Sequence, residues 1–304
     1  MIIKVLGSSA GGGLPQWNCN CLNCDATRKK KKGFSARTQS SIALSDTGKS
    51  WVVINASPDI RDQIEAFPPI RVSGPTRGSN IAAVLLTDSQ IDHCAGLLQL
   101  REHPQLKVYC TKSASDDLNG PFPLLKILSH YQKLEWYEIK LDSPQPLVIP
   151  ELPTIEIYPI ILGGKAPPYS FSDHSKFDGC GIALLLMDKH SGASCFYAPG
   201  LDEISERLLA TMKTATCLLI DGTFWQEDEM ITLRLGHKSA KEMGHIPLSG
   251  SNGLLSMLKK MESPRKILIH INNSNPILDE HSEERAILTK EGIEVSFDGM
   301  EIRL

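Results

Sequence analysis

Residues with the chemistry of metal ligands gather at two places in the sequence. At residues 88–93 the chain reads D-S-Q-I-D-H, just after the apolar run 81–86. An unbroken run of this length is typical of a strand buried on both faces, although a short buried helix has the same pattern. Open α/β sheets place their sites at the carboxyl ends of such strands. We therefore interpret residues 88–93 as part of a site rather than as a surface loop.

The second place is the short segment that holds Cys19, Cys21 and Cys24. The C-x-C-x-x-C spacing brings three thiolates within reach of one tetrahedral zinc ion, with Zn–S bonds of about 2.3 Å. Buried free cysteines are the alternative interpretation. Three ligands leave the fourth to come from elsewhere in the chain. We predict a zinc knuckle at residues 19–24 that holds a structural Zn²⁺ ion.

The composition limits the class of protein. The chain has 304 residues, of which 41% are hydrophobic and 22% charged, with a net charge of -3. This balance argues against a nucleic-acid surface, which needs a concentrated positive field. No apolar window approaches the roughly 18 residues of a membrane-spanning helix. The 8 cysteines are too few for a disulfide scaffold, so we predict a reducing, cytoplasmic location.

Strands and helices alternate along the chain and must position the candidate ligands. Strands are predicted at residues 1–6, 39–44, 51–56, 81–86, 107–111, 147–162, 182–187, 193–198, 217–221 and 266–271. Helices are predicted at 60–67, 96–100, 201–212, 237–244 and 283–291, with mixed helix and loop at 113–135 and a closing hairpin at 293–304. Neither a clean linker nor a short repeat is visible. Residues 1–304 are therefore predicted to form one domain, a sheet-on-sheet core with helices outside.

Residues 163–179 are predicted to form a long irregular loop, which holds Tyr169, Phe171, Asp173 and His174. Loops of this length in a compact domain are usually functional lids or disordered segments.

Three predicted buried strands end in polar residues. The first leads into residues 88–93, the second ends at Asp221, and the third carries His270. In this arrangement the chain resembles the metallo-β-lactamase superfamily. The resemblance implies an α/β (α+β) fold, a four-layer αββα sandwich with metals at strand ends. The superfamily's hallmark H-x-H-x-D-H reads D-S-Q-I-D-H here, so Asp92 and His93 match and both leading histidines are replaced.

Longer motifs are similar to those of one family, coenzyme PQQ synthesis protein B. They occur along residues 1–304 and include G-S-S-A-G-G-G-L-P-Q-W-N-C-N-C, A-R-T-Q-S-S-I-A-L-S-D, N-A-S-P-D-I-R, D-G-T-F-W, E-M-G-H and L-I-H-I-N-N-S-N-P-I-L. The resemblance implies a role in the biosynthesis of pyrroloquinoline quinone (PQQ), whose precursor is a cross-linked Glu–Tyr unit. The tyrosine ring of that precursor must gain oxygen to become a quinone.

The departures from the superfamily pattern change the expected chemistry. In two-metal hydrolases of this fold the leading histidines hold one ion, and a late aspartate bridges both. Here the leading histidines are replaced, and Pro199-Gly200 stands at the expected place of the bridging aspartate, so the first metal site is expected to be lost. Asp92, His93 and His270 survive. Two histidines, one carboxylate and open positions suit non-haem Fe(II) oxygen chemistry, so we expect an active-site Fe²⁺, with Zn²⁺ as the alternative.

Other polar residues are expected to support these ligands. Asp88, Gln90 and Asp221 would orient the ligands or take part in proton transfer. His245 is either an acid or base in the cleft or a capped structural histidine. Arg37, together with the long loop, would bind carboxylates of the substrate, because a bidentate arginine suits them.

The fourth ligand of the knuckle is left open by the sequence. In related phosphodiesterases of the superfamily a histidine three residues beyond the last active-site histidine completes the site, and here that place is Asn273. Either Asn273 or water completes the zinc site, or His270 serves the knuckle. The last alternative would leave the catalytic metal with only Asp92 and His93.

Three functions are compatible with these residues. We favour an enzyme, a mononuclear non-haem iron hydroxylase that acts on the tyrosine ring of the small Glu–Tyr precursor. The alternatives are a non-catalytic carrier of PQQ or its precursor towards the periplasm, and a zinc hydrolase with a metal-activated water. The fold alone does not decide among them. Expected partners are the precursor and other PQQ biosynthesis proteins, and a homodimer is considered; nucleic acid and a membrane span are not expected.

Overall fold

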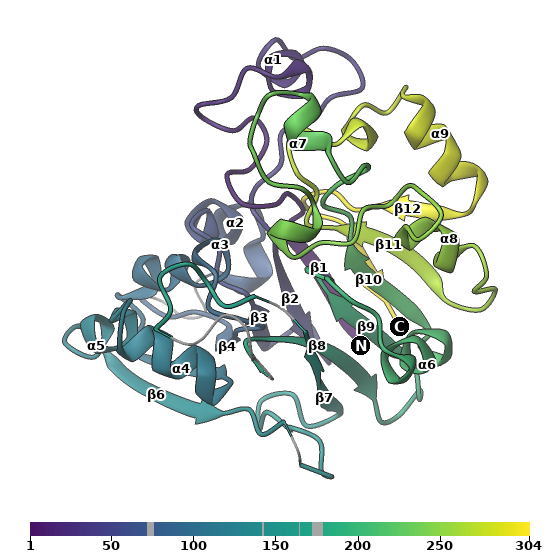
Figure 1. Cartoon of the computed structure of the whole chain (residues 1–304). Helices are drawn as coiled ribbons and strands as arrows, with labels where there is room; N and C mark the ends of the chain where they lie inside the picture. The colour runs from purple at the N-terminus through teal and green to yellow at the C-terminus, as the bar shows by residue number, and fades with distance from the viewer. Residues whose placement is uncertain (72–75, 142, 164, 172–178) are drawn as a thin grey trace. The chain divides into compact units, whose positions relative to one another are not determined.

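The strand predicted from the apolar run 81–86 is present in the computed structural model as β4 (Ile81–Leu85). The structure describes residues 1–71, 76–141, 143–163, 165–171 and 179–304, so Asp173 and His174 of the predicted loop lie outside the described residues. The chain divides into two units, and most of their helices and strands are labelled in Figure 1. Unit 1 comprises Met1–Gly7, Ser40–Ser194 and Gly299–Leu304, and unit 2 comprises Ser8–Gln39 and Cys195–Asp298.

Unit 1 is built around a sheet whose strands, within the described residues, follow the order β13-β1-β2-β3-β4-β5-β6. The strands beside β4 are β1 (Ile2–Gly7), β2 (Ser41–Ser45), β3 (Trp51–Ile54), β5 (Gln105–Cys110), β6 (Lys133–Glu138) and β13 (Glu301–Arg303). β1 pairs antiparallel with β13 and β2, and β2 with β3, whereas the strands from β3 to β6 are parallel. β2 and β3, which correspond to the strands predicted at residues 39–44 and 51–56, thus form an antiparallel hairpin. The same unit holds an antiparallel pair, β7 (Ile155–Leu162) and β8 (Gly181–Asp188).

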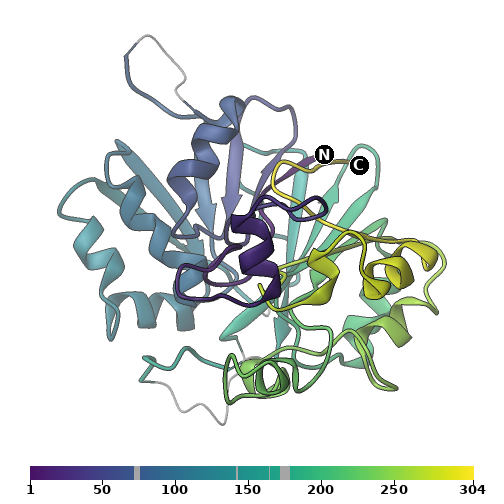
Figure 2. The ribbon, with the colours of Figure 1, turned by 90° about the horizontal axis from the view of Figure 1, so that it is seen from above.

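One face of this sheet packs against helices. Alternate residues of each strand point to that face. Val53, Val84 and Val108 share a buried core with Ile60 and Leu97, which come from helices. These blue and teal helices lie beside the strands in Figure 2. The helical segments of unit 1 are α2 (Ile60–Ala66), η1 (Pro68–Ile70), α3 (Ile91–Cys94), η2 (Ala95–Leu100), α4 (Lys112–Asn119) and α5 (Leu124–Leu128). The remaining residues of β3 are buried too, so both faces of this strand are covered.

Unit 2 contains parallel strands in the order β9-β10-β11-β12. Asp221, the last residue of β10, lies opposite Ile269, the last of β11, so the ends of these strands are neighbours. The strands are β9 (Ser194–Ala198), β10 (Cys217–Asp221), β11 (Arg265–Ile269) and β12 (Ile293–Val295). The helical segments are α1 (Leu22–Arg28), α6 (Glu206–Thr214), α7 (Glu229–Thr232), η3 (Lys241–Met243), α8 (Leu254–Leu258), η4 (Pro276–Leu278) and α9 (Glu283–Lys290).

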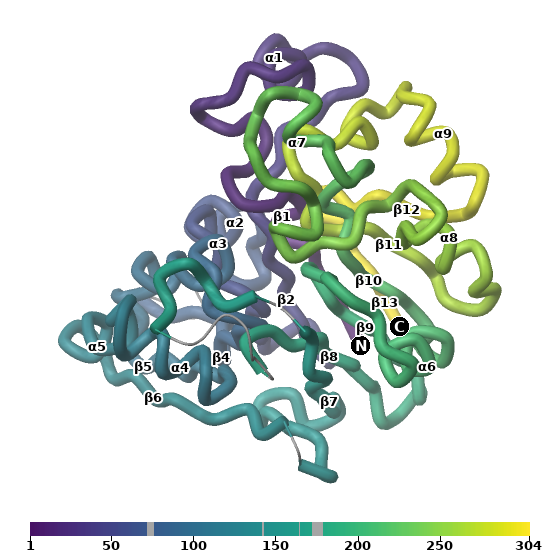
Figure 3. The backbone as a smooth tube through the Cα atoms, in the orientation of Figure 1, coloured from purple at the N-terminus to yellow at the C-terminus, as the bar shows by residue number. Residues whose placement is uncertain are grey.

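The N-terminal segment of unit 2 returns to the end of β11. Ser9 forms parallel β-bridges with Gln39 and with Ile271, and the Ala10 N–H donates to the Ile271 carbonyl at 2.9 Å. In Figure 3 the N-terminal stretch is purple and the stretch after β11 is yellow, so they are far apart in sequence. The cysteine segment is attached to the loop that follows β11, because the side-chain amide of Asn23 donates to the carbonyls of Asn273 and Asn275.

Several predicted elements differ from the structure. The closing hairpin at 293–304 is wrong, because β12 pairs in parallel with β11 and β13 pairs antiparallel with β1. The helix predicted at 201–212 begins only at Glu206, where the Ser205 hydroxyl accepts the Leu208 N–H and caps it. Leu201 instead donates its N–H to Asp221.

Other boundaries also move. The strands predicted at 147–162 shorten to β7, with a single bridge between Leu147 and Ile157. The first half of β6 falls in the range 113–135 that was predicted as mixed helix and loop. Among the described residues of the helix predicted at 237–244, only η3 is helical. The helix predicted at 96–100 is the 3-10 helix η2, and α3 precedes it. None of the helices in the described ranges is long and apolar enough to cross a membrane.

Candidate metal centres

The predicted zinc knuckle forms a compact cluster in unit 2. The side-chain Nδ2 of Asn273 lies 3.2 Å from Sγ of Cys19, 3.5 Å from Sγ of Cys21 and 3.4 Å from Sγ of Cys24. Asn273 is itself held, because its carbonyl accepts the side-chain amide N–H of Asn23 at 2.9 Å. The amide group thus stands at a fourth vertex above three sulfurs.

This arrangement fits a tetrahedral zinc site. With Zn–S bonds of about 2.3 Å and a Zn–O bond of about 2.0 Å, a ligand oxygen would lie about 3.5 Å from each sulfur. The amide nitrogen and oxygen have nearly the same shape, so a flip of the Asn273 side chain places Oδ1 at that vertex. Burial is the main cause that raises the pKa of Cys21 to about 11, and the neighbouring thiols are a smaller one. A metal ion must therefore displace a proton from this thiol.

In unit 1, the segment that follows β4 orients His93. Both oxygens of the Asp88 carboxylate lie 2.8 Å from His93 Nδ1, and the Gln90 N–H donates to Asp88 Oδ1 at 2.9 Å. His93 Nε2 lies 4.0 Å from Asp92 Oδ2. Two metal–ligand bonds of about 2.1 Å can span that distance. Asp88 therefore leaves Nε2 of His93, beside Asp92, as the nitrogen available to an ion.

The surroundings of His93 favour its charged form in the absence of metal. Burial by itself lowers the pKa of His93, but the charges of Asp88 and Asp92 and the hydrogen bond to Asp88 outweigh burial and raise it to about 9. An ion would have to replace a proton on this ring as well.

Close packing fixes the backbone of the same segment. The Ala56 N–H donates to the His93 carbonyl at 2.7 Å, and the Gly96 N–H donates to the Ala56 carbonyl at 2.9 Å. A Cβ at Gly96 would lie 1.9 Å from the carbonyl oxygen of Ser57. A glycine is required here because the two backbones approach so closely.

The described part of the predicted loop is attached to this segment. The Ser170 hydroxyl donates to Asp117 at 2.5 Å, and the Ser89 hydroxyl donates to the other oxygen of Asp117 at 2.7 Å. The Tyr169 hydroxyl donates to the Ser89 carbonyl, and the Gln90 side chain reaches the Lys165 carbonyl at 3.4 Å. Asp117 was not predicted to be important, because it lies in α4 with no motif around it.

In unit 2, the buried carboxylate of Asp221 contacts His245, Leu201 and Thr223. Its Oδ2 lies 2.7 Å from His245 Nδ1 and accepts the Leu201 N–H at 2.8 Å. Its Oδ1 accepts the Thr223 N–H at 2.9 Å and lies 2.6 Å from the Thr223 hydroxyl. The hydroxyl is also 2.9 Å from His270 Nδ1. The rings of His245 and His270 stack with centroids 5.3 Å apart.

Asp221 is suited to orienting the histidines. It is fully buried, and both of its oxygens already accept hydrogen bonds from the chain. Burial disfavours its ionised form, but the charge and hydrogen bond of His245 outweigh burial and keep the pKa of Asp221 below its usual value. His270 follows β11 with a φ of 60°, a left-handed conformation that is uncommon for a residue with a side chain. Such strained positions concentrate at functional sites.

His270 lies with Asp221 and His245, whereas Asn273 covers the sulfurs of the knuckle. Within the described residues of unit 2, the alternative in which His270 is the fourth knuckle ligand therefore finds no support. Arg37 is 6% exposed, and its guanidinium donates to the Ser296 carbonyl and to the Ser8 hydroxyl. Burial lowers the pKa of Arg37 to about 10. These contacts give Arg37 a structural role; its predicted contact with substrate stays a prediction.

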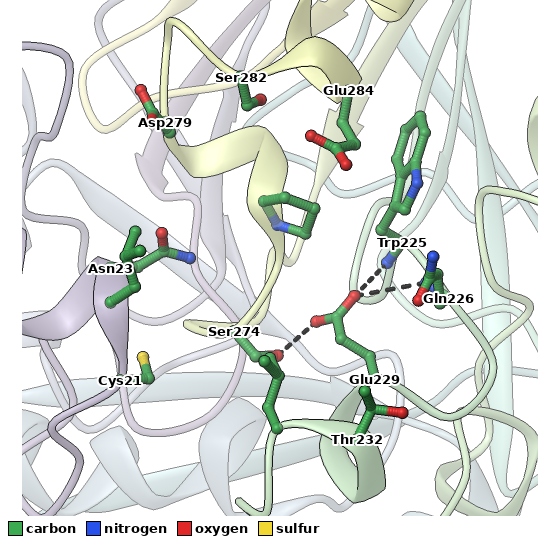
Figure 4. A pocket seen from close by; sticks show the side chains of 13 residues that line it. Cys21, Asn23, Trp225, Gln226, Glu229, Thr232, Ser274, Asp279, Ser282 and Glu284 are labelled. Carbon is green, nitrogen blue, oxygen red and sulfur yellow. Dashed lines mark hydrogen bonds between the residues drawn. The ribbon is translucent and has the colours of Figure 1, made fainter.

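A cavity of about 290 Å³ lies beside the knuckle in unit 2, with Cys21 on its wall. Figure 4 shows the Glu229 carboxylate between Ser274 and the backbone N–H groups of Trp225 and Gln226. Burial raises the pKa of Glu229, although these hydrogen bonds oppose the change. Glu229 joins α7 to the loop after β11 and was not recognised from the sequence.

Comparison with known proteins gives the family. A family model described as "Beta-lactamase superfamily domain" matches residues 50–271. Coenzyme PQQ synthesis protein B of Stutzerimonas stutzeri is 51% identical over 305 residues, and that of Nitrosococcus oceani is 51% identical over 309 residues. Both alignments cover 100% of each chain.

Solved structures agree with this assignment. The crystal structure of Zn²⁺-bound PqqB from Methylobacterium extorquens matches with a TM-score of 0.91 and 35% identity, and the match covers 100% of both chains. A diphosphatase of the PhnP family, with a TM-score of 0.71 and 17% identity over 100% of this chain and 97% of its own, shares the fold. The predicted metallo-β-lactamase fold is thus confirmed. The chain belongs to the coenzyme PQQ synthesis protein B family, within the β-lactamase superfamily.

Proposed function

We propose that this protein catalyses a metal-dependent hydroxylation of the tyrosine ring of a Glu–Tyr-derived PQQ precursor. The observation that carries the proposal is the contact between Asp88 and His93, which presents Nε2 of His93 beside Asp92. Carboxylate-oriented histidines of this kind are characteristic of metal ligands. A decayed, non-catalytic metal box would not need this arrangement.

The proposed ligands of the active-site metal are Asp92, His93 and His270. Their donor set, two imidazoles and one carboxylate, fits Fe²⁺ and leaves coordination positions open. When bound, the iron would supply the means to activate O₂. The overall reaction converts one ring C–H bond to C–OH, and the second oxygen atom leaves as water with two protons and two electrons from an external reductant.

Asp221 and His245 are proposed to move a proton during this reaction. Asp221 holds His245 Nδ1 at 2.7 Å, so the neutral ring carries its lone pair on Nε2. That nitrogen could accept the phenolic proton of the substrate, which makes the ring more electron-rich and easier to oxidise. Gln90 and Arg37 keep the roles predicted from the sequence, as an orienting group and a substrate-binding group.

The knuckle is proposed to hold a structural Zn²⁺ through Cys19, Cys21, Cys24 and Asn273. The support for this proposal is that the Asn273 side-chain amide lies within 3.5 Å of all three cysteine sulfurs. The relative from Methylobacterium extorquens is Zn²⁺-bound, in agreement with a metal-binding family. A cytoplasmic location and contacts with other PQQ biosynthesis proteins complete the proposal.

The test is anaerobic reconstitution with Fe²⁺, followed by a Glu–Tyr substrate, a reductant and ¹⁸O₂, with the products followed by mass spectrometry. We expect one ¹⁸O atom in the product. Asp92→Ala and His93→Ala should abolish it, whereas His190→Ala, on an exposed turn of unit 1, should not.

Two results would overturn the proposal. If the substrate mass stays unchanged in iron-loaded protein that binds PQQ tightly, the chain is a carrier. If Zn²⁺-loaded protein, without reductant, adds water to the substrate or cleaves it, the chain is a hydrolase.

A further inference from the structure

We propose that Thr223 is a positioning residue that fixes the tautomer of His270, so that Nε2 is the nitrogen left for a metal ion. The inference rests on the proposed function, because it takes His270 as a metal ligand. It assigns a role to a residue that touches neither the expected ion nor the substrate.

The Thr223 hydroxyl has three polar neighbours within hydrogen-bond distance. Its Oγ1 lies 2.6 Å from Asp221 Oδ1, 2.8 Å from the His270 carbonyl oxygen and 2.9 Å from His270 Nδ1. The carboxylate and the carbonyl can only accept hydrogen bonds, whereas the ring nitrogen can donate or accept.

The number of protons determines how these contacts are made. A hydroxyl has one proton and two lone pairs, so Thr223 can donate to only one neighbour at a time. The charged and nearest acceptor, Asp221, makes the stronger bond. His270 Nδ1 then faces a lone pair of the hydroxyl oxygen, and the contact is attractive only if Nδ1 carries the proton. The lone pair of the neutral ring is therefore on Nε2.

Thr223 cannot easily turn away from this position. Its side chain and backbone are buried, with 2% of the residue exposed. Its N–H donates to Asp221 at 2.9 Å, and its carbonyl accepts the Asn272 N–H at 3.1 Å and the Asn275 side-chain amide at 3.2 Å. Thr223 thus helps to join the strand end that supplies Asp221 to the loop that follows His270.

The result is a branched network in which one carboxylate orients two histidines. Asp221 Oδ2 holds His245 directly, and Asp221 Oδ1 holds His270 through the Thr223 hydroxyl. Hydrogen-bonded partners behind a metal-bound histidine fix its tautomer and ring orientation, and their loss typically lowers metal affinity by about 10–100-fold. The Thr223 hydroxyl contacts Nδ1 of His270 in the same way that the Asp88 carboxylate contacts Nδ1 of His93.

The experiment compares Thr223→Val, which keeps the shape but lacks the hydroxyl, with Thr223→Ser, which restores it. Co²⁺ is titrated, with a competing chelator, into protein whose cysteine site already holds Zn²⁺. Co²⁺ bound by nitrogen and oxygen ligands lacks the strong thiolate bands of a cysteine site, so the two sites are distinguished by absorbance. Thr223→Val should bind Co²⁺ about 10–100-fold more weakly, and Thr223→Ser should bind it like the unchanged protein.

Thr111→Val is the matched control. Thr111 is also buried, and the substitution removes hydroxyl bonds that cap α4 and reach the Gly179 carbonyl. Thr111 contacts no proposed ligand, so the variant should be less stable but should bind Co²⁺ as the unchanged protein does. If it weakens Co²⁺ binding as much as Thr223→Val does, the effect is general destabilisation and the proposal is overturned.

A second measurement needs no variant. Long-range ¹H–¹⁵N correlation spectra of the metal-free protein report which ring nitrogen is protonated, and we expect the proton of neutral His270 on Nδ1. A proton on Nε2 would overturn the proposal, as would unchanged Co²⁺ affinity in Thr223→Val. His270→Ala separates this from the proposed function: if that variant still binds Co²⁺ like the unchanged protein, the proposed ligand set itself is wrong.

Discussion

Both carboxylate oxygens of Asp88 lie 2.8 Å from Nδ1 of His93. His93 is 4% exposed and the side chain of Asp88 is 19% exposed, so the interaction is largely shielded from water, and charges act more strongly on each other there than in bulk water. This contact has consequences for metal binding and for the dependence of stability on pH.

We predict that Asp88→Asn weakens metal binding in the active site by about 10–100-fold, because a neutral amide, which can donate as well as accept, replaces the carboxylate that fixes the tautomer of the ring. The pKa of His93 should fall from about 9, since the nearest negative charge is removed. Chelator competition and NMR titration of the His93 ring measure the two effects. Unchanged values for both would contradict the orienting role of Asp88.

Metal-free protein should lose stability as the pH rises. Because folding raises the pKa of His93 from 6.5 to about 9, its contribution is fully present below pH 6.5 and is lost as the pH rises through about 9. A difference of about 2.5 pKa units corresponds to about 3 kcal/mol at most. Urea unfolding at pH 6.5 and at pH 9 measures the change, and Asp88→Asn should show a flatter dependence. An equal pH dependence in both proteins would show that another group is responsible.

His245→Gln should separate proton transfer from metal binding. We expect product formation to fall by about 10²–10⁴-fold, the usual contribution of a general acid or base, while the bound metal is retained because His245 is not a proposed ligand. Turnover and metal content are measured on the same preparation. Turnover within a few-fold of the unchanged protein would favour the capped, structural interpretation of His245.

Asn273 should decide whether the knuckle retains its ion. Asn273→Asp keeps an oxygen at the fourth position and should retain Zn²⁺, whereas Asn273→Ala should bind it more weakly and unfold at a lower temperature. Structural zinc contributes directly to folding, so chelation of Zn²⁺ should lower the Tm of the unchanged protein too. Equal zinc affinity in the Ala and Asp variants would instead indicate that water is the fourth ligand.

The attachment of the loop to the metal segment can be tested at Ser170. Ser170→Ala removes the bond to Asp117 and should cost about 1.5–3 kcal/mol of unfolding free energy, as for hydrogen bonds to charged groups. Urea unfolding gives the value. Ser143→Ala, an exposed serine whose bonds stay within its own turn, is the control and should change the unfolding free energy by less than about 0.5 kcal/mol. Equal effects of the two substitutions would mean that the Asp117 contact is unimportant.

Local patterns in the sequence determined much of the fold and of the candidate ligands. The unbroken apolar run before Thr87 predicted a buried strand, and β4 is that strand. Such runs can be interpreted locally, because the hydrophobic pattern of a segment is a property of its own side chains. The C-x-C-x-x-C spacing likewise identified a cysteine cluster within six residues, and the long motifs identified the family.

Only the tertiary structure decided which distant groups meet. Thr223 reaches a histidine 47 residues away in the chain, and Asp117 binds a serine 53 residues away. The partners of β12 and β13 were mispredicted for the same reason. Apolar periodicity shows that a segment is a strand, but its pairing depends on which strand edges remain open when the rest of the chain has folded. The sequence determines the ligand types, whereas the folded chain determines their hydrogen-bond partners, tautomers and pKa values.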